Sequence, residues 1–564
     1  MTYPRPASKP MPSRRSFALL FLLAALAADA GQVTLLEADR IYRLDPKHQQ
    51  AKAMAWDEDG RILALGEPRT LARRYPDARR IKAKGGTVIP GLIDAHGHLM
   101  GLGLALMRVD LVDTRSTAEI LDRLKVFERG LPEGAWLLGR GWDQNDWREP
   151  VYPSAAELDI AFPERPVWLE RIDGHAGWAN SAAMRASGKN FDGDWQPDGG
   201  RIERQGERAR GVFVDQATAL IEQAIPPPDP AFRADALRRA LQQAVAHGLT
   251  GVHDMGVSRA DLALYRQFAD AGQLPLRITA YADGDAEAFA DLCRAGRYRH
   301  AGGRLAMPGV KLYIDGALGS RGAALEADYS DAPGQRGLLL TPPEQFKRLI
   351  AKAKACGLQV ASHAIGDRGN RIVLDSYEEV LGDPAGQAHR FRVEHAQVVG
   401  PGAISRFARL GVIASMQPSH ATSDMPWAEA RVGAERLAGA YAWRQFLNAG
   451  VELTLGSDFP VESSDPRLGL YAAVSRQDLQ GKPAGGWLPG ERLAILEALH
   501  GYTGAAAYAG FAESEVGELS PGYRADFVVL GADPLRVLPK RLPELPITST
   551  WVDGRKVHPS ATGH

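Results

Sequence analysis

Two histidines on alternate positions, His96 and His98, are the residues whose types and spacing point most directly to chemistry. They follow an apolar, β-branched run that predicts a buried strand. Side chains at positions i and i+2 of a strand point the same way, so the two imidazoles can hold one metal ion. A single His-x-His pair is weak evidence, and the prediction therefore depends on further candidate ligands along the chain.

Those further candidates stand at the ends of other predicted strands. They are Lys311, His363, His395 and Asp458. Imidazole and carboxylate are ligands that zinc prefers. Four histidines and an aspartate that converge on one edge of a sheet predict a metal centre. His253, which ends another strand, is either a site residue or a structural one, and Glu394 is expected to face away from the site and to be structural.

The segments that must position these residues alternate between short apolar runs and helical patterns, which is typical of a parallel sheet. The predicted strands cover residues 87–94, 249–253, 276–281, 310–315, 358–363, 391–395, 412–417 and 452–458. Parallel strands with intervening helices in this number predict an α/β fold, a TIM-type (β/α)8 barrel. Its reactive groups are expected at the carboxyl ends of the strands.

Both ends of the chain are rich in short strands and turns, which predicts that they pair into one small β-sandwich. Near the C-terminus, strands are expected over residues 515–519, 525–530 and 548–552. The interval between the first two barrel strands far exceeds the roughly 30 residues of a β-to-β repeat, so it predicts a large insert. The predicted parts are an export signal (1–30), the sandwich (31–86 and 511–564), barrel strand 1 (87–104), an inserted domain (105–230) and the remaining barrel (231–510).

Several short segments, spread over the whole mature chain, form a set that is specific for one family. They are residues 90–98, Gly141-Trp142-Asp143, Asp173-Gly174-His175, Val310-Lys311 with Asp315-Gly316, residues 363–367, residues 392–395, and Gly456-Ser457-Asp458. In these segments the chain resembles the amidohydrolase superfamily. Within it the resemblance is to the amidohydrolase-3 branch, which includes N-substituted formamide deformylase-like proteins. The set specifies the branch but not the substrate.

The resemblance implies a role for each matched ligand. His96 and His98 would bind the more buried of two metal ions together with Asp458, and His363 and His395 would bind the second. Lys311 would bridge the ions as a carbamate made with CO2, because a carbamate is an anion with two oxygens whereas an ammonium is no ligand. An ordinary lysine beside a single-metal site stays open. The expected cofactor is a divalent metal, one or two ions, with zinc as the first choice.

The resemblance also implies metal-assisted hydrolysis of a C–N amide bond in an N-acyl or N-formyl amine. Asp458 would act as general base and then as general acid. Cyclic amides, carbamates and esters remain open as substrates of the same site, and a non-catalytic metal-binding barrel is a second alternative. Deamination of a ring is disfavoured, because the segment from His363 to Gly366 lacks the glutamate that deaminases of this superfamily use.

Candidate substrate contacts come from two sources. Trp142, Asp143 and His175 match sequence motifs of the family. Arg321 and Gln417 would orient a polar group of the substrate. Six of the 11 tryptophans fall within the predicted insert, at positions 136, 142, 147, 168, 178 and 195. They form either an apolar wall for a hydrophobic amine substituent or the insert's own core.

Bulk composition is that of an ordinary globular protein. The 564 residues are 45% hydrophobic and 24% charged, and a net charge of −1 gives no basic surface for nucleic acid. The two cysteines, Cys293 and Cys356, cannot make a disulfide framework and are expected to be reduced core thiols. The expected partner is a small-molecule substrate, without nucleic acid, and a homo-oligomer is left open.

The N-terminus has the pattern of a targeting segment. Ser13-Arg14-Arg15-Ser16-Phe17 precedes an apolar run over residues 18–28, and Ala28-Asp29-Ala30 fits a cleavage site. The run is short for a bilayer span, so no stable membrane insertion is expected after cleavage. The arginine pair followed by phenylalanine resembles a twin-arginine signal and predicts a periplasmic protein. An ordinary secretory signal or an uncleaved anchor are the alternatives.

Overall fold

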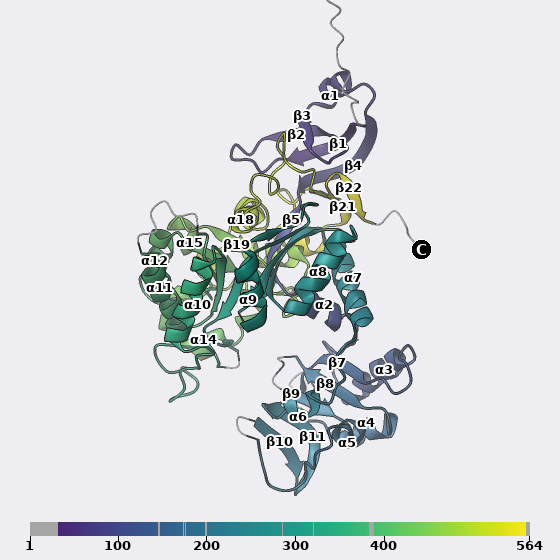
Figure 1. Cartoon of the computed structure of the whole chain (residues 1–564), viewed down its shortest axis with the longest axis vertical. Coiled ribbons are helices and arrows are strands. Elements are labelled where there is room, and N and C mark those ends of the chain that lie inside the picture. The colour runs from purple at the N-terminus through teal and green to yellow at the C-terminus, as the bar shows by residue number, and fades with distance from the viewer. Residues whose placement is uncertain are drawn as a thin grey trace, which may run out of the picture.

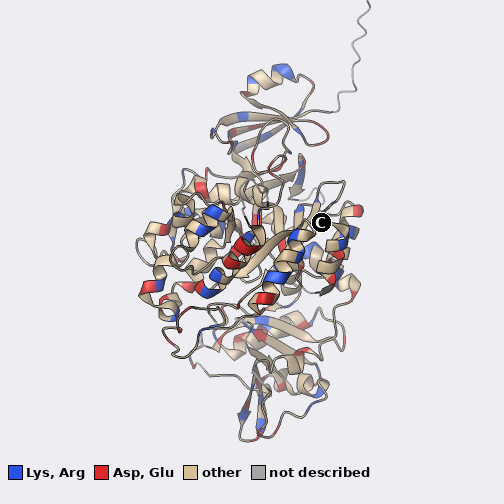
Figure 2. Ribbon diagram, turned by 60° about the vertical axis from the view of Figure 1, so that its left-hand side comes forward, with Lys and Arg blue, Asp and Glu red and all other residues tan. Residues whose placement is uncertain are grey.

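The computed structural model of this chain describes residues 32–144, 147–149, 151–172, 174, 176–197, 200–284, 286–319, 321–382 and 389–559. The predicted export signal and the candidate residue His175 lie outside the described residues. A barrel occupies the middle of the molecule, with one sheet at its upper end and a second sheet at its lower end (Figure 1). The same three parts are seen from a second direction in Figure 2.

Parallel strands form a nearly closed central barrel in the order in which the chain visits them. They are β5 (Leu92–Gly97), β12 (Leu249–Val257), β13 (Arg277–Asp283), β15 (Leu305–Tyr313), β16 (Gln359–Ala364), β17 (Arg392–His395), β18 (Ile413–Met416) and β19 (Leu453–Leu455). A parallel bridge between Gly97 and Phe459 brings the last strand back to the first. The predicted (β/α)8 barrel is therefore confirmed. A short strand, β14 (Tyr298–Arg299), pairs with β15 outside this path.

Helices that follow the barrel strands bury their apolar faces against the barrel. They are α2 (Leu99–Ala105), α7 (Pro230–Ala246), α8 (Arg259–Asp270), α9 (Ala286–Ala295), α10 (Pro343–Ala355), α11 (Asp367–Leu381), α12 (Ala403–Leu410), α13 (Pro418–Asp424), α14 (Ala428–Arg436), α15 (Trp443–Asn448), α16 (Pro466–Ser475), α17 (Ile495–Gly501) and α18 (Gly504–Ala509). In α8, for example, Leu262, Tyr265 and Phe268 recur at helical spacing and are buried. Ser258 caps this helix by accepting a hydrogen bond from the Asp261 backbone N–H.

The first predicted barrel strand, residues 87–94, is divided between two sheets. Thr87 to Pro90 complete β4 (Arg79–Pro90) in the upper sheet, whereas the barrel strand begins at Leu92. The change occurs at Gly91, whose backbone N–H donates to the Asp526 carbonyl and where any side chain would collide with Thr250. The single-strand prediction is wrong because both strands are buried and apolar, so no polar residue marks the boundary between them.

The upper sheet contains both ends of the described chain. Its order is β22-β21-β20-β4-β1-β2-β3, from β1 (Thr34–Tyr42), β2 (Gln50–Trp56), β3 (Ile62–Gly66), β4, β20 (Phe527–Leu530), β21 (Ile547–Val552) and β22 (Arg555–His558), with α1 (Pro68–Arg74) beside it. Antiparallel pairing of β20 with β4 joins the two ends. Residues 515–519, predicted as a strand, form turns instead, because Gly517 takes a φ of 97°, outside the strand region.

The lower sheet occupies the interval between β5 and β12. Its order is β10-β11-β9-β8-β7-β6, from β6 (Val109–Asp110), β7 (Leu137–Trp142), β8 (Val167–Arg171), β9 (Ala176–Ala179), β10 (Gly200–Gln205) and β11 (Arg208–Asp215). Helices α3 (Thr117–Glu128), α4 (Ala155–Ala161), α5 (Ser181–Ala186) and α6 (Ala219–Glu222) accompany it. Trp142, Trp147, Trp168 and Trp178 are buried in two apolar clusters of this insert. Of the two alternatives, these tryptophans therefore form the insert's own core.

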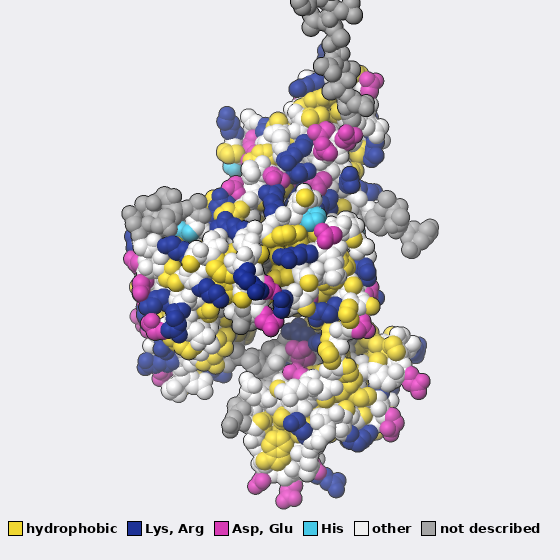
Figure 3. Space-filling view, viewed as in Figure 1, with side chains coloured by type: hydrophobic (Ala, Val, Ile, Leu, Met, Phe, Trp, Pro, Cys, Tyr) yellow, Lys and Arg dark blue, Asp and Glu magenta, His cyan; other side chains and the backbone are white. Residues whose placement is uncertain are grey.

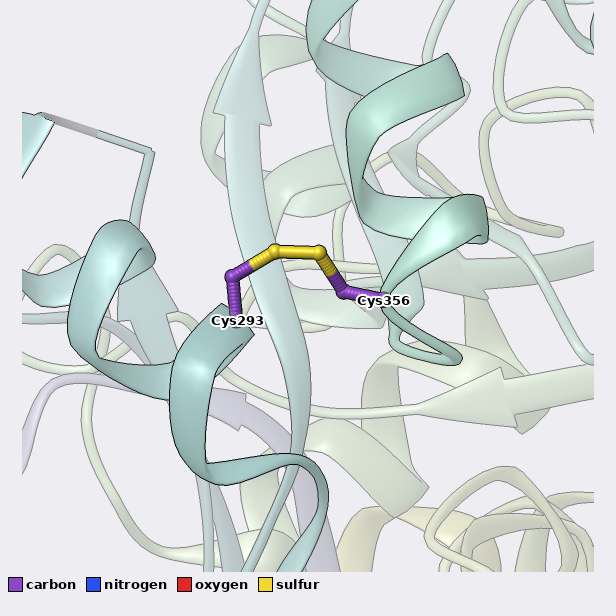
Figure 4. Close-up of a disulfide and its surroundings, with 2 residues drawn as sticks. All are labelled: Cys293 and Cys356. Carbon is purple, nitrogen blue, oxygen red and sulfur yellow. A yellow bond between two sulfur atoms is a disulfide. The ribbon is translucent and has the colours of Figure 1, made fainter.

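Cys293 and Cys356 form a disulfide on the outer face of the barrel (Figure 4), with their Cα atoms 5.2 Å apart. The prediction of two reduced thiols is wrong. The reason is spatial: Cys293 lies on α9 and Cys356 ends α10, and consecutive helices of a barrel lie side by side although their residues are far apart in sequence.

Positive and negative side chains are interspersed over the face shown in Figure 3, in keeping with the net charge near zero. Among the residues that the structure describes, no helix has the length and apolar character needed to cross a bilayer.

Candidate metal centre and active site

A cavity of about 1550 Å³ lies at the carboxyl ends of the barrel strands, between the barrel and the insert. All six predicted metal-site residues line it, namely His96, His98, Lys311, His363, His395 and Asp458. Residues of the insert, Asp143 and Arg171 among them, form part of its wall. The structure thus brings to one place residues that the sequence spreads over much of the chain.

Asp458 lies among three imidazoles. Its Oδ1 atom is 3.0 Å from His98 Nε2 and 3.4 Å from His96 Nε2, and its Oδ2 atom is 3.8 Å from His420 Nε2. Burial alone would raise the pKa of this carboxyl group, but His96 and His98 outweigh burial and hold the pKa of Asp458 well below its usual range. The carboxylate is therefore ionised at neutral pH, the state that a metal ligand or a general base requires.

Three histidines of the cavity, His96, His363 and His395, are held neutral; for His98, burial is outweighed by the hydrogen bond with Asp458, which raises the pKa of that imidazole. Burial, assisted by the charge of Lys311, lowers the pKa of His96 to about 4 and that of His363 to about 3. Burial and the neighbouring His363 place the pKa of His395 well below its usual value. A neutral imidazole keeps a lone pair for a metal ion. One potential ligand atom on each of His96, His395 and Asp458 lies within 4.8 Å of the others, a spacing compatible with a shared ion.

His363 provides a direct test of whether a metal fits. Its Nε2 atom is buried and has no hydrogen-bond partner among the described residues. Asp315, its nearest carboxylate, has Oδ1 3.6 Å away, beyond hydrogen-bond distance. Leaving a buried polar atom unpaired is costly, and a coordinated cation would satisfy it. The donor set and this orphan atom together fit a divalent metal.

Lys311 reaches the same place from β15. Its side chain is buried, and Nζ lies 3.2 Å from His96 Nε2. Burial lowers the pKa of the Lys311 amine to about 8. An ammonium group is poorly accommodated beside ligand nitrogens, so this position favours an uncharged or derivatised lysine.

The backbone turns two of these side chains into the cavity. His395 has a φ of 75° and Asp458 a φ of 61°, left-handed values that are uncommon for residues other than glycine. Such strain persists only where the surrounding structure enforces it, and it concentrates at functional sites. Because His395 departs from extended geometry, the strict alternation of β17 ends there.

Glu394 therefore does not face away from the site, and that prediction is wrong. Its Oε2 atom lies 2.6 Å from His96 Nδ1. Arg392, two residues earlier on the same strand face, donates to both carboxylate oxygens. Burial would raise the pKa of Glu394, but Arg392 holds it well below its usual value. The ionised carboxylate accepts a hydrogen bond from the Nδ1–H group of His96. The ring therefore carries its proton on Nδ1, and the Nε2 lone pair faces the cavity.

Two other histidines are oriented in a similar way. His98 Nδ1 lies 2.9 Å from the Met255 carbonyl oxygen, and His395 Nδ1 lies 2.8 Å from Gln417 Oε1. Gln417 is only 3% exposed and does not line the cavity. Gln417 therefore does not make the predicted contact with substrate, and it orients the His395 ring instead. Both imidazoles present Nε2 to the cavity when Nδ1 donates to these oxygens.

Asp94 ties the first and last barrel strands together below the cavity. Its carboxylate accepts hydrogen bonds from the His96 backbone N–H at 3.0 Å and from the Ser457 hydroxyl at 2.6 Å. The strand ends that bear His96 and Asp458 are thereby held in register.

The structure does not place Trp142 at the cavity. The side chain is fully buried in the insert, where its Nε1–H donates to the Leu169 carbonyl at 2.7 Å. Its predicted contact with substrate is wrong because the neighbouring strand needs this side chain for packing. Asp143, the next residue, does line the cavity and forms an ion pair with Arg171 at 2.7 Å.

Arg321 lines the cavity as predicted, but its guanidinium is engaged. It donates to Asp331 through Nε at 3.0 Å and through Nη2 at 2.8 Å, which ties it to a loop on the barrel rim. His253 lies away from the cavity, with Nδ1 2.9 Å from Arg392 Nη1, so the structural alternative holds for this residue.

Sequence reasoning did not identify His420 on α13. Its ring stacks on His395 with centroids 5.9 Å apart, and its buried Nε2 atom has no hydrogen-bond partner in the described part of the chain. No strand ends at this residue, so the strand-end rule that selected the other candidates could not select it.

Residues 79–558 match the Amidohydrolase family. The chain is 34% identical to the protein YtcJ of Bacillus subtilis (strain 168), over 89% of this chain and 95% of that protein. It is 31% identical to the N-substituted formamide deformylase of Arthrobacter pascens, over 88% of this chain and 93% of that protein. A solved structure of an uncharacterized metal-dependent hydrolase from Pyrococcus horikoshii OT3 has a TM-score of 0.75 at 28% identity, covering 90% of this chain and 99% of that one.

Proposed function

This chain belongs to the amidohydrolase family and is a metal-dependent hydrolase, and we propose that it cleaves the C–N bond of an N-acyl or N-formyl amine. The observation that carries the proposal is the ionised carboxylate of Asp458 at the centre of the candidate ligand set. It lies in a cavity large enough for a small-molecule substrate.

His96, His98 and Asp458 would hold one divalent ion, and His363 and His395 would hold a second. Zinc is the first choice because its preferred ligands are imidazole nitrogen and carboxylate oxygen. When bound, the metal lowers the pKa of water and polarises the carbonyl of the substrate. His96, His363 and His395 present neutral imidazoles and Asp458 an ionised carboxylate, whereas His98, whose pKa Asp458 raises, would release a proton on binding the metal.

Lys311 would bridge the two ions as a carbamate. Its lowered pKa supports this role, because only the uncharged amine adds to CO2, with release of one proton to solvent, and a pKa of about 8 leaves roughly a tenth of the amine uncharged at pH 7. Its position beside His96 Nε2 puts the derivatised end at the ligand set.

Asp458 would move the proton in both halves of the reaction. It accepts a proton from the attacking water, and it later gives that proton to the nitrogen as the C–N bond breaks. His98, 3.0 Å from Oδ1, fixes the direction of the carboxylate. One water and one amide yield one carboxylic acid and one amine, so atoms and charge balance.

The cavity walls support an amine that carries a bulky apolar substituent. Leu318, Ile365, Trp427 and Val461 contribute apolar surface to the same cavity. The relative from Arthrobacter pascens, named for N-substituted formamides, points to the same substrate class. Asp143 of the insert would contact the far end of the substrate, where it is held by its ion pair with Arg171.

The experiment is amine release by zinc-loaded enzyme across N-formyl amines, N-acyl amines, cyclic amides, carbamates and esters. We expect release from acyclic amides, faster as the apolar N-substituent grows. Hydrolysis confined to rings or esters would contradict the substrate proposal while leaving the metal site in place. No hydrolysis of any member by protein with measured metal content would contradict the catalytic proposal.

We also propose that residues 1–30 direct export to the periplasm. The arginine pair before an apolar run supports this, and so does the Cys293–Cys356 disulfide, because disulfides persist in oxidising compartments. Fractionation of cells that express the full chain, with and without Arg14→Lys and Arg15→Lys together, tests it. Periplasmic enzyme in the wild type alone is expected, and an unchanged distribution would contradict a twin-arginine signal.

A further inference from the structure

A second, smaller cavity lies at the opposite end of the barrel from the metal site. Its volume is about 230 Å³, and it is lined mainly by the first halves of β5, β12, β13 and β15 together with residues that follow α18. Most of its wall is apolar, from Ile93, Val252, Ile278, Ala306, Pro308 and Val516. A mostly apolar cavity of this size, open at one side, suits a small organic molecule.

His253 presents a hydrogen-bond donor at the inner end of this cavity. Arginine carries only donors, so His253 Nδ1 must accept the 2.9 Å hydrogen bond from Arg392 Nη1. Burial, with the nearby Arg392 charge, holds the pKa of His253 well below its usual value, so the neutral ring carries its proton on Nε2. The Arg392 contact thus fixes the tautomer.

The Nε2–H group has no hydrogen-bond partner within the described ranges of the chain, and it faces Gly510. A Cβ at Gly510 would lie 2.8 Å from Nε2 and 3.4 Å from the Thr279 hydroxyl. Both polar groups therefore surround a point that only glycine leaves open, on the wall of the cavity. This donor therefore faces the cavity and can bind an acceptor there.

The arginines at the mouth of the cavity differ in their partners among the described residues. Arg299 pairs with Glu515 at 2.7 Å, and Arg277 pairs with Asp526 at 2.7 Å. For Arg297 no ion pair is found in the part of the chain that the structure describes. Its Nε donates to the Gly357 carbonyl, and its guanidinium lies 4.3 Å from the centre of the Phe511 ring.

We propose that this cavity is a second ligand site, which binds a small carboxylate with a compact apolar body and a hydrogen-bond acceptor at its far end. The acceptor takes the His253 Nε2–H, the body lies against the apolar wall, and the carboxylate lies at Arg297. The ligand also contacts a hydrogen-bonded chain that reaches the metal site, because Arg392 bonds Glu394, and Glu394 bonds His96. The proposal does not depend on which amide the enzyme cleaves.

The probe is 4-hydroxybenzoate, which has a phenolic oxygen opposite its carboxylate, titrated calorimetrically into the metal-loaded full chain. We expect one saturable site per chain. Gly510→Ala, whose methyl group fills the inner end beside His253, should weaken binding at least tenfold. Gly66→Ala is the matched control, because a Cβ at Gly66 has no neighbour within 4 Å, and it should bind as the wild type does.

Arg297→Gln keeps the proposal falsifiable if Gly510→Ala disturbs the fold, because Arg297 is exposed and the change is conservative. It should weaken 4-hydroxybenzoate severalfold while leaving phenol, which lacks the carboxylate, unaffected. Absence of binding to the wild type would overturn the proposal. So would equal affinity in the wild type, Gly510→Ala and Arg297→Gln, since the probe would then occupy another site, such as the metal centre.

Discussion

Replacing Glu394 by glutamine should weaken metal binding without touching any proposed ligand. The carboxylate has two oxygens, one shared between His96 Nδ1 and Arg392 and the other facing Arg392 alone. Glutamine has one oxygen and one NH2 group. If the NH2 group faces Arg392, donors oppose donors. If it faces His96, the ring must accept at Nδ1 and carry its proton on Nε2, which removes the lone pair from the cavity.

The expected losses of metal affinity and of folding stability follow from these two orientations of the glutamine side chain. Loss of an outer partner of a ligating histidine costs about 10- to 100-fold in metal affinity, which is about 1.4 to 2.7 kcal/mol. The change also leaves Arg392, fully buried, without its counter-charge, and breaking a buried ion pair in this way costs about 3 to 5 kcal/mol of folding stability. Both effects should therefore appear together.

The assay is competition for zinc against a chromophoric chelator, with denaturant unfolding of the same preparations. Glu378→Gln is the matched control, because Glu378 pairs with Arg406 and Arg409 on the surface of α11, where an ion pair contributes less than about 1 kcal/mol. Unchanged zinc affinity in folded Glu394→Gln would refute the reasoning that Glu394 sets the His96 tautomer.

In metal-free enzyme the pKa of His96 is about 4 in the folded state and near 6.5 in the unfolded state. The free energy of unfolding should therefore fall as the pH drops from 6.5 toward 4. A Tm that does not change with pH over this range would contradict a neutral, buried His96. Cys293→Ser should lower the free energy of unfolding by up to about 4 kcal/mol, because the disulfide closes a loop of 63 residues, and it should leave kcat/KM unchanged. Equal denaturation midpoints for the wild type and the variant, both kept without reductant, would argue against the disulfide. Trp142→Phe should destabilise the insert by about 1 to 3 kcal/mol yet change KM little, whereas a large rise in KM in stable protein would restore Trp142 to the cavity wall.

The barrel could be predicted from sequence because its signals are local. Each barrel strand is a short apolar run, and the carboxyl ends of parallel strands meet at one edge, so His363 and Asp458 could be assigned to one place without knowing any distance. The boundary at Gly91 could not, because nothing in a continuous apolar run shows that the chain leaves one sheet for another.

Within the site, the direction in which side chains point was the property that the sequence predicted least well. Glu394 was expected to face outward from strand alternation, but the left-handed backbone at His395 breaks that alternation. Trp142 and Gln417 were predicted to contact the substrate because of their residue type and position. In the structure Trp142 donates to the Leu169 carbonyl instead, and Gln417 bonds His395. The disulfide and His420 required knowledge of which helices lie side by side, which is a property of the folded chain alone.

The most direct test of the central claim compares zinc-loaded wild type with Asp458→Asn, measuring bound metal and the rate of amine release from an N-formyl amine in the same samples. Our account predicts that the variant keeps much of its metal through His96, His98, His363 and His395. Its rate should nevertheless fall by about 100- to 10,000-fold, the contribution of a general base. Full activity in a metal-loaded Asp458→Asn variant would contradict the account.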